Sequence, residues 1–224
     1  MFEGKFVKMI KELVDKILWK KLWVLTGLNK QKGFVKNYEC LRKSTTLNHC
    51  DMFNVYSCAL ACNKLEGDVA EVGVYKGSSV KLIKQMTNKV VFAFDTFNGI
   101  PEITKFDKKQ GGGMFKKGDF NSGLEIITNL QKLGIKTFKG IFPQETGKFV
   151  EKESFCFVHL DVDVYKSTKD CLQFFYPRLV SGGIILSHDY PNSLGVKKAF
   201  DEFFKDKKEV LICLLDQQVL VVKK

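Results

Sequence analysis

No stretch of the 224-residue sequence approaches the roughly 20 unbroken apolar residues that a membrane-spanning helix needs. The first residues also lack the features of a secretory signal peptide, because Lys and acidic residues interrupt them and no small-residue cleavage site follows. The chain is 45% apolar and can therefore bury a substantial core. We expect a folded protein that is neither inserted in a membrane nor secreted.

The seven cysteines show no metal-binding or redox spacing. Their number is odd, and no Cys-x-x-Cys pair or zinc-ligand set occurs. Cys156 lies in an apolar run and Cys171 in a helical pattern, where free thiols behave as small hydrophobic groups. The simplest interpretation is reduced thiols in a cytoplasmic protein.

The sequence also lacks clusters of Arg and the mixed aromatic and basic motifs of RNA-binding domains. Its net charge is nevertheless +11, and nearly all of the positive charge is Lys. We interpret this charge as solvated Lys over the whole surface and expect no nucleic-acid partner. The alternative is a basic module that binds anionic membrane or RNA.

Residues 1–25 are a candidate amphipathic helix, since several of their apolar side chains fall on one helical face: Phe6, Ile10, Leu13, Val14 and Ile17. Such a helix suits peripheral contact with an anionic membrane. We favour packing on its own domain or on a second subunit, and the spare apolar face favours a homo-oligomer. Residues 28–44 are polar and basic and are interpreted as a linker. The expected division is therefore 1–44, amphipathic helix and linker, and 45–224, the main domain.

From residue 67 onward, apolar strand patterns alternate with helical ones, which is typical of a parallel sheet covered on both faces. Strands are expected at 69–74, 90–95, 135–141, 155–161 and 184–187, the last after a turn at 181–183. Helices are expected at about 50–65, 77–87, 122–133, 167–179 and 194–205. Apolar runs at 210–215 and 219–222 predict a terminal hairpin. The polar stretch 97–121 is long enough to suggest a functional lid, most specifically over 103–119.

The first cluster with chemical meaning is EVGVYKGSS (71–79), which lies between a predicted strand and a predicted helix. Gly73 permits a tight turn and a close approach of a ligand to the backbone. The helix that begins near Gly77 points free N–H groups at such a ligand. The Glu71 carboxylate suits a cationic amino group and would repel a pyrophosphate. A plain turn is the alternative interpretation.

Asp95 ends the next predicted strand, 24 residues after Glu71. At this spacing an acidic residue takes the ribose hydroxyls in nucleotide-binding βαβ units. The alternative is a helix or turn cap. The combination with the glycine cluster favours a ribose contact.

A third cluster follows two further strands. Asp161 and Asp163 lie in HLDVDVY (159–165), and His188 and Asp189 lie in HDY (188–190). Ligands bind open α/β sheets at the carboxyl ends of strands, and clustered oxygen ligands there suit a hard cation such as Mg²⁺. A carboxylate left over from the metal is a candidate general base. Helix capping and a structural hydrogen bond are the alternative roles.

With these clusters in place, the chain resembles the macrocin O-methyltransferase (TylF) family from about Thr45 to Phe204. The resemblance rests on GDVAEVGVYKGSSV (67–80), FDTFNGIPE (94–102), KGIFPQET (139–146), HLDVDVYKST (159–168), YPRLVSGGIILSHDY (176–190) and GVKKAFDEF (195–203). It implies an α/β, Rossmann-like class I methyltransferase fold. That fold has a seven-stranded, mostly parallel sheet with an antiparallel C-terminal strand, here with additional N-terminal helices.

The resemblance further implies S-adenosylmethionine as methyl donor, a sugar or glycan hydroxyl as acceptor, and Mg²⁺ or another divalent cation at the acceptor site. It places the donor at Glu71, Gly73, Tyr75, Gly77, Ser78, Asp95, Thr96 and Phe97. It places the metal at Asp161 and Asp189, with Asp163 as the general base, and His188 is a third candidate ligand. The metal would chelate vicinal sugar oxygens, Asp163 would take the hydroxyl proton, and the alkoxide would attack the donor methyl group.

One position departs from the family pattern, which often has Asp-Asp-Tyr where this chain has His188-Asp189-Tyr190. A neutral imidazole makes the site less anionic, and Mg²⁺ prefers oxygen ligands. Weaker Mg²⁺ binding, a softer metal and a water-filled position are all compatible with the sequence.

Two other enzyme classes share some of these features. A nucleotide-sugar glycosyltransferase also uses an Asp-x-Asp such as Asp161-Val162-Asp163, but Glu71 would repel its diphosphate. A nicotinamide-dependent oxidoreductase fits the strand, the turn and Asp95, but the sequence has no G-x-G-x-x-G.

Overall fold

The computed structural model describes residues 30–108 and 113–224. The candidate amphipathic helix at 1–25, and with it the expected membrane or subunit contact, lies outside these residues. The chain divides into two units, Met1–Cys40 and Leu41–Lys224. The expected division at residue 44 stays a prediction.

Residues expected to form a linker are helical instead, in α2 (Lys32–Leu41). The rings of Phe34 and Tyr38 lie one turn apart on this helix, with centroids 5.5 Å from each other. Phe34, Tyr38 and Leu41 recur at helical spacing, and the polar and basic residues around them conceal this pattern in a composition-based interpretation.

The second unit is built on a seven-stranded sheet with the order β3-β2-β1-β4-β5-β7-β6. Its strands are β1 (Asp68–Val72), β2 (Val91–Asp95), β3 (Lys136–Lys139), β4 (Phe155–Leu160), β5 (Leu179–Ser187), β6 (Ile212–Cys213) and β7 (Val219–Val222). Strands β1 to β5 are parallel, whereas β7 pairs antiparallel with both β5 and β6. This sheet confirms the predicted fold class, and the β6–β7 pair is the predicted terminal hairpin.

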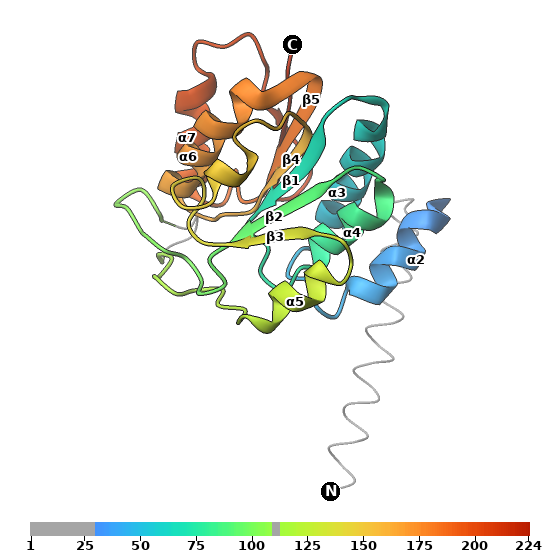
Figure 1. Ribbon diagram of the computed structural model, residues 1–224. Helices are drawn as coiled ribbons and strands as arrows, with labels where there is room; N and C mark the ends of the chain where they lie inside the picture. The colour runs from blue at the N-terminus through green and yellow to red at the C-terminus, as the bar shows by residue number, and fades with distance from the viewer. Residues whose placement is uncertain (1–29, 109–112) are drawn as a thin grey trace, which may run out of the picture. The chain divides into compact units, whose positions relative to one another are not determined.

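Helices lie on both faces of the sheet (Figure 1), with α3 and α4 against one face and α6 and α7 against the other. They are α3 (His49–Ala61), α4 (Ser78–Met86), α5 (Glu125–Gln131), α6 (Tyr165–Phe175) and α7 (Leu194–Phe204). Short 3-10 turns are η2 (Cys62–Lys64), η3 (Gly147–Val150) and η4 (Tyr176–Arg178). None of the described helices is both long and apolar enough to cross a membrane.

The turn expected at 181–183 lies within β5 instead. Gly182 N–H donates to the Lys223 carbonyl, and Lys223 N–H donates to the Gly183 carbonyl, so this segment pairs with the end of the chain. Gly182 has a φ of +76°, which glycine adopts without strain. The glycines therefore make an irregular part of a strand rather than its boundary.

The stretch 97–121 is held by hydrogen bonds within itself and by a hydrogen bond to the start of α6. Ile100 N–H donates to the Asp119 carbonyl, and Gly118 N–H donates to the Ile100 carbonyl. Asp107 is fully buried, and its carboxylate accepts from Thr104 N–H and from Tyr165 N–H, at the first turn of α6. The lid function of this stretch stays a prediction.

Phenylalanine forms much of the core between the sheet and α6. The Phe175 ring stacks on Phe142 with centroids 4.8 Å apart and meets Phe155 edge-on at 5.0 Å. All three rings are at most 5% exposed. Strand β4, at the centre of the sheet, is buried along its whole length, as expected for a parallel strand covered on both faces.

We predict that Phe175→Ala lowers the free energy of unfolding by about 3–5 kcal/mol, because it removes a buried ring and leaves a cavity. Leu133→Ala is the control, since Leu133 is 51% exposed and should change stability by about 0.5 kcal/mol or less. Urea unfolding followed by circular dichroism measures both. Equal effects of the two substitutions would contradict this description of the core.

Candidate active site

A cavity of about 670 Å³ opens at the carboxyl ends of β1, β2, β4 and β5. The strand order reverses between β1 and β4, which is where open α/β sheets bind ligands. Eight predicted site residues line it: Gly73, Tyr75, Asp95, Thr96, Asp161, Asp163, His188 and Asp189. Segments that are distant in the sequence therefore meet at one place.

Gly73 brings the loop after β1 against the loop after β4. Its φ is +85°, and a Cβ added there would lie 1.9 Å from the carbonyl oxygen of Asp161. No side chain fits into that space, so the two backbones cross in contact. As a result, the glycine cluster after β1 and the acidic cluster after β4 face the same cavity.

Asp95 is held rigidly at the end of β2. Its Oδ2 accepts from the N–H groups of Val74 and Tyr75 at 2.7 and 2.8 Å, and its Oδ1 accepts from Phe97 N–H at 2.6 Å. Burial raises the pKa of Asp95, and these three donors only partly oppose that effect. The carboxylate thus orders the loop after β1 and still borders the cavity.

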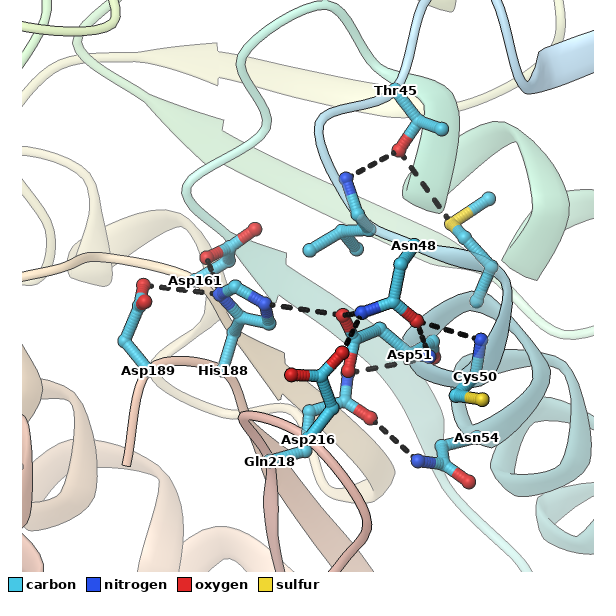
Figure 2. A network of polar contacts seen from close by, with 12 residues as sticks. Thr45, Asn48, Cys50, Asp51, Asn54, Asp161, His188, Asp189, Asp216 and Gln218 are labelled. Carbon is cyan, nitrogen blue, oxygen red and sulfur yellow. Dashed lines mark hydrogen bonds and ion pairs between the residues drawn. The ribbon is translucent and has the colours of Figure 1, made fainter. Parts of the chain in front are cut away.

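His188 lies among three carboxylates at the other side of the cavity (Figure 2). Its Nδ1 is 3.3 Å from Asp161 Oδ1 and 3.0 Å from Asp189 Oδ2, whereas Nε2 is 3.5 Å from Asp51 Oδ2. Burial disfavours the imidazolium, but the carboxylates, Asp161 foremost, outweigh burial and raise the pKa of His188. His188 in turn holds the pKa of Asp161 below its ordinary value, against the effect of burial.

Asp163 has the opposite shift. Burial raises its pKa well above the ordinary value, and the negative charges of Asp189 and Asp161 raise it further. Its backbone lies in the left-handed region, with a φ of +63°, and its carbonyl accepts from Ser193 Oγ at 2.8 Å. Asp189 has a φ of +61°. Backbone strain of this kind is concentrated at functional sites, where the surrounding structure enforces it.

Four of the predicted donor residues do not line the cavity: Glu71, Gly77, Ser78 and Phe97. Glu71 is fully buried, and its Oε1 accepts from Ser79 Oγ and lies 3.0 Å from His159 Nδ1. Burial raises the pKa of Glu71. Its Oε2 has no hydrogen-bond partner among the described residues, and its contact with the donor stays a prediction.

The sequence interpretation missed several residues at the site. Asp51, on α3, contacts His188, and Thr46, Asn192 and Gln217 line the cavity. None of them belongs to a glycine cluster or to an acidic cluster directly at a strand end, so no local pattern indicates them. The packing of α3 and of the β6–β7 turn against the strand ends brings Asp51 and Gln217 there.

The donor atoms of Asp161, His188 and Asp189 fit a divalent cation. One ligand atom from each lies within 4.8 Å of the others. A cation at roughly 2.0–2.2 Å from neighbouring ligands separates those ligands by about 3 Å. The Nδ1–oxygen distances of 3.0 and 3.3 Å agree with that separation.

Comparison with known proteins adds to this geometry. The sequence model of the family described as Macrocin-O-methyltransferase (TylF) matches residues 48–216, well over half of the chain. The chain belongs to this family. Membership in the TylF family favours a methyltransferase over the glycosyltransferase and oxidoreductase alternatives.

Two curated relatives of this TylF-family chain come from Streptomyces. Demethyldecarbamoylnovobiocin O-methyltransferase of Streptomyces niveus is 24% identical over 63% of this chain and 59% of its own length. The 8-demethyl-8-(2,3-dimethoxy-alpha-L-rhamnosyl)-tetracenomycin-C 4'-O-methyltransferase of Streptomyces olivaceus is 27% identical over 55% of this chain and 53% of its own length. The chain therefore matches little more than half the length of these relatives.

A solved structure, that of the O-methyltransferase NovP, superposes with a TM-score of 0.68. The alignment has 21% sequence identity and covers 80% of this chain and 82% of NovP. At this identity the likeness establishes the fold.

We predict that Asp163→Asn becomes increasingly more stable than the wild type as pH rises from about 4 to 8 in the presence of EDTA. The pKa of Asp163 is higher in the folded than in the unfolded protein, so its stability contribution falls as pH rises above the unfolded value of about 4. Asparagine carries no proton to lose. Urea midpoints at several pH values measure the difference, with Asp206→Asn as control. A pH-independent difference would contradict the assigned shift.

Proposed function

We propose that the protein is an S-adenosylmethionine-dependent O-methyltransferase that acts on a sugar or glycan hydroxyl with the help of a divalent cation. The observation that carries this proposal is the pairing of two different polar sites in one cavity. Asp95 and the turn at Gly73 form one side, and the cluster of Asp161, Asp163, His188 and Asp189 forms the other. Membership in the TylF family supports the reaction type.

The donor occupies the side formed by Gly73, Tyr75, Asp95 and Thr96. A carboxylate has about four lone-pair sites, and Asp95 uses three of them for backbone N–H groups. The remaining acceptor capacity faces the cavity and suits a ribose hydroxyl. Because the three N–H groups fix the carboxylate, the donor binds to a preorganised group.

Asp163 is the proposed general base. Its raised pKa moves the carboxylate closer to the operating pH, where a base is most effective. When bound by Asp161, His188 and Asp189, a divalent cation supplies charge that makes a nearby hydroxyl more acidic. Asp163 takes the hydroxyl proton while the hydroxyl oxygen forms a bond to the methyl carbon. The bond from this carbon to sulfur breaks, which leaves S-adenosylhomocysteine and a methyl ether.

The rest of the cavity wall suits a sugar attached to an apolar group. Ile100, Phe115 and Phe142 are apolar and buried, whereas Asn192 and Gln217 offer amide groups. Apolar C–H faces and hydroxyl edges alternate on a sugar ring, which matches such a mixed wall. The name of the Streptomyces olivaceus relative includes a rhamnosyl group, which makes rhamnosyl-bearing compounds the first acceptors to test.

We predict that S-adenosylhomocysteine binds the wild type with micromolar affinity both with Mg²⁺ and with EDTA, as measured by calorimetry. Asp95→Ala should weaken binding about tenfold or more, because it removes a charged acceptor. Asp206→Ala is the control, since Asp206 is exposed and does not line the cavity. Absence of binding to the wild type in both conditions would refute the donor site.

We predict that Asp163→Asn lowers the rate of methyl transfer by about 10²–10⁴-fold, the usual contribution of a general base. Its affinity for S-adenosylhomocysteine should stay within about twofold of the wild type, because the base lies on the acceptor side. Transfer of a labelled methyl group to rhamnosyl-bearing acceptors measures the rate. Turnover at the wild-type level would refute the assignment of the base.

A further inference from the structure

The carboxylate of Asp51 lies behind His188, on the side of the ring that faces away from Asp161 and Asp189 (Figure 2). Asp51 is in the first turn of α3 and is 1% exposed. Its Oδ2 is 3.5 Å from His188 Nε2, and its Oδ1 has no hydrogen-bond partner among the described residues. A buried carboxylate needs a donor or a cation nearby, and the imidazole ring is placed to supply it.

Asp51 is held in position by several independent contacts. Asn48 caps α3 by accepting from the N–H groups of Cys50 and Asp51, and Asn48 Nδ2 donates to Asp51 Oδ2 at 2.6 Å. Asn48 also donates to Asp216. Gln218 Nε2 donates to the Asp51 carbonyl at 3.4 Å, and Asn54 Nδ2 donates to Gln218 Oε1 at 2.8 Å. The carboxylate is therefore part of a network that joins α3 to the β6–β7 turn.

The His188 ring lies between Asp51 on one side and Asp161 and Asp189 on the other. With Nε2 directed at Asp51, Nδ1 is directed at Asp161 Oδ1 and Asp189 Oδ2. A metal-binding histidine usually donates its other ring N–H to a carboxylate, which fixes the tautomer and raises the basicity of the ligand nitrogen. The arrangement of Asp51, His188 and the two acids has this form.

The donor set that results contains one imidazole nitrogen and two carboxylates. Mg²⁺ prefers all-oxygen surroundings and is held by carboxylates and water. Imidazole nitrogen suits first-row transition metals, and Mn²⁺ is the member of that series that also suits the two carboxylates. Replacing one oxygen ligand by nitrogen therefore changes which divalent cation the site prefers.

We propose that Asp51 is a positioning residue that holds His188 as an Nδ1 ligand, and that the site consequently binds a transition-metal ion such as Mn²⁺ in preference to Mg²⁺. This inference rests on the metal-assisted function proposed above. It concerns the choice of metal and the residue that sets it.

The first experiment is calorimetric titration of MnCl₂ and MgCl₂ into the full-length, EDTA-treated protein saturated with S-adenosylhomocysteine. The wild type should bind Mn²⁺ more tightly than Mg²⁺ by at least about tenfold. Asp51→Asn should weaken Mn²⁺ binding by about 10–100-fold, the usual cost of losing a carboxylate behind a ligand. Asp216→Asn is the matched control, because Asp216 contacts Asn48 in the same network and has no contact with His188. It should bind Mn²⁺ within about twofold of the wild type.

The second experiment detects the nitrogen ligand directly. Pulsed electron paramagnetic resonance of bound Mn²⁺ should show coupling to a directly coordinated nitrogen in the wild type and none in His188→Asp. His188→Asp should also lower the preference for Mn²⁺ over Mg²⁺ by about tenfold, since its ligands are all oxygen. This variant keeps the proposal testable if Asp51→Asn fails to fold.

Three results would overturn the inference: no metal bound to the wild type, no nitrogen coupling, or unchanged Mn²⁺ affinity in a folded Asp51→Asn variant. Binding of S-adenosylhomocysteine, measured on the same samples, distinguishes each of these results from failure of the methyltransferase proposal. Retained binding of S-adenosylhomocysteine with any of these results refutes only the metal inference. If the wild type does not bind S-adenosylhomocysteine, the proposed function itself is refuted.

Discussion

The contact between the backbones of Gly73 and Asp161 is the constraint on which the rest of the site depends. Strands β1 and β4 are neighbours at the point where the strand order reverses, so the loops that follow them diverge around the cavity. Because Gly73 has no Cβ, the backbones at the start of these loops can touch, and the two polar sides of the cavity lie close together. Transfer between two bound molecules requires this closeness, since much of the rate comes from positioning.

The short distances between the strand ends also bring several negative charges together. Asp161, Asp163 and Asp189 follow the ends of two adjacent strands, and Asp51 approaches from α3. Burial, together with the negative charges of Asp189 and Asp161, raises the pKa of Asp163, whereas His188 outweighs burial and lowers the pKa of Asp161, so the group contains two kinds of carboxyl. A neighbouring positive group decides whether the pKa of a buried carboxyl is lowered or raised, and for Asp161 that group is His188. Environments that push the pKa values of adjacent carboxyls apart are typical of sites that need both a ligand and a base.

Much of the fold follows from local patterns in the sequence. Val91–Asp95 and Phe155–Leu160 are short, apolar and followed by acidic residues, so both the strands and the residues at their ends are predictable. The exceptions have physical causes. Helix α2 is concealed by polar and basic residues around its apolar ones, and the glycines of β5 suggest a turn where a long strand continues. The contacts of Glu71 with Ser79 and His159 are decided only by the packing of α4 and β4. Asp51 carries no local signal, because its role arises from helix packing alone.

In the stretch 97–121, different residues line the cavity and anchor the segment to the rest of the domain. Ile100, Phe115 and Phe120 form part of the cavity wall, whereas Asp107 fastens the same segment to α6 through Tyr165 N–H. The residues that line the cavity and the residue that anchors the segment are therefore different. Exchange of a lining residue can change the shape of the cavity while the anchor is kept. Such an exchange leaves the residues at the strand ends in place.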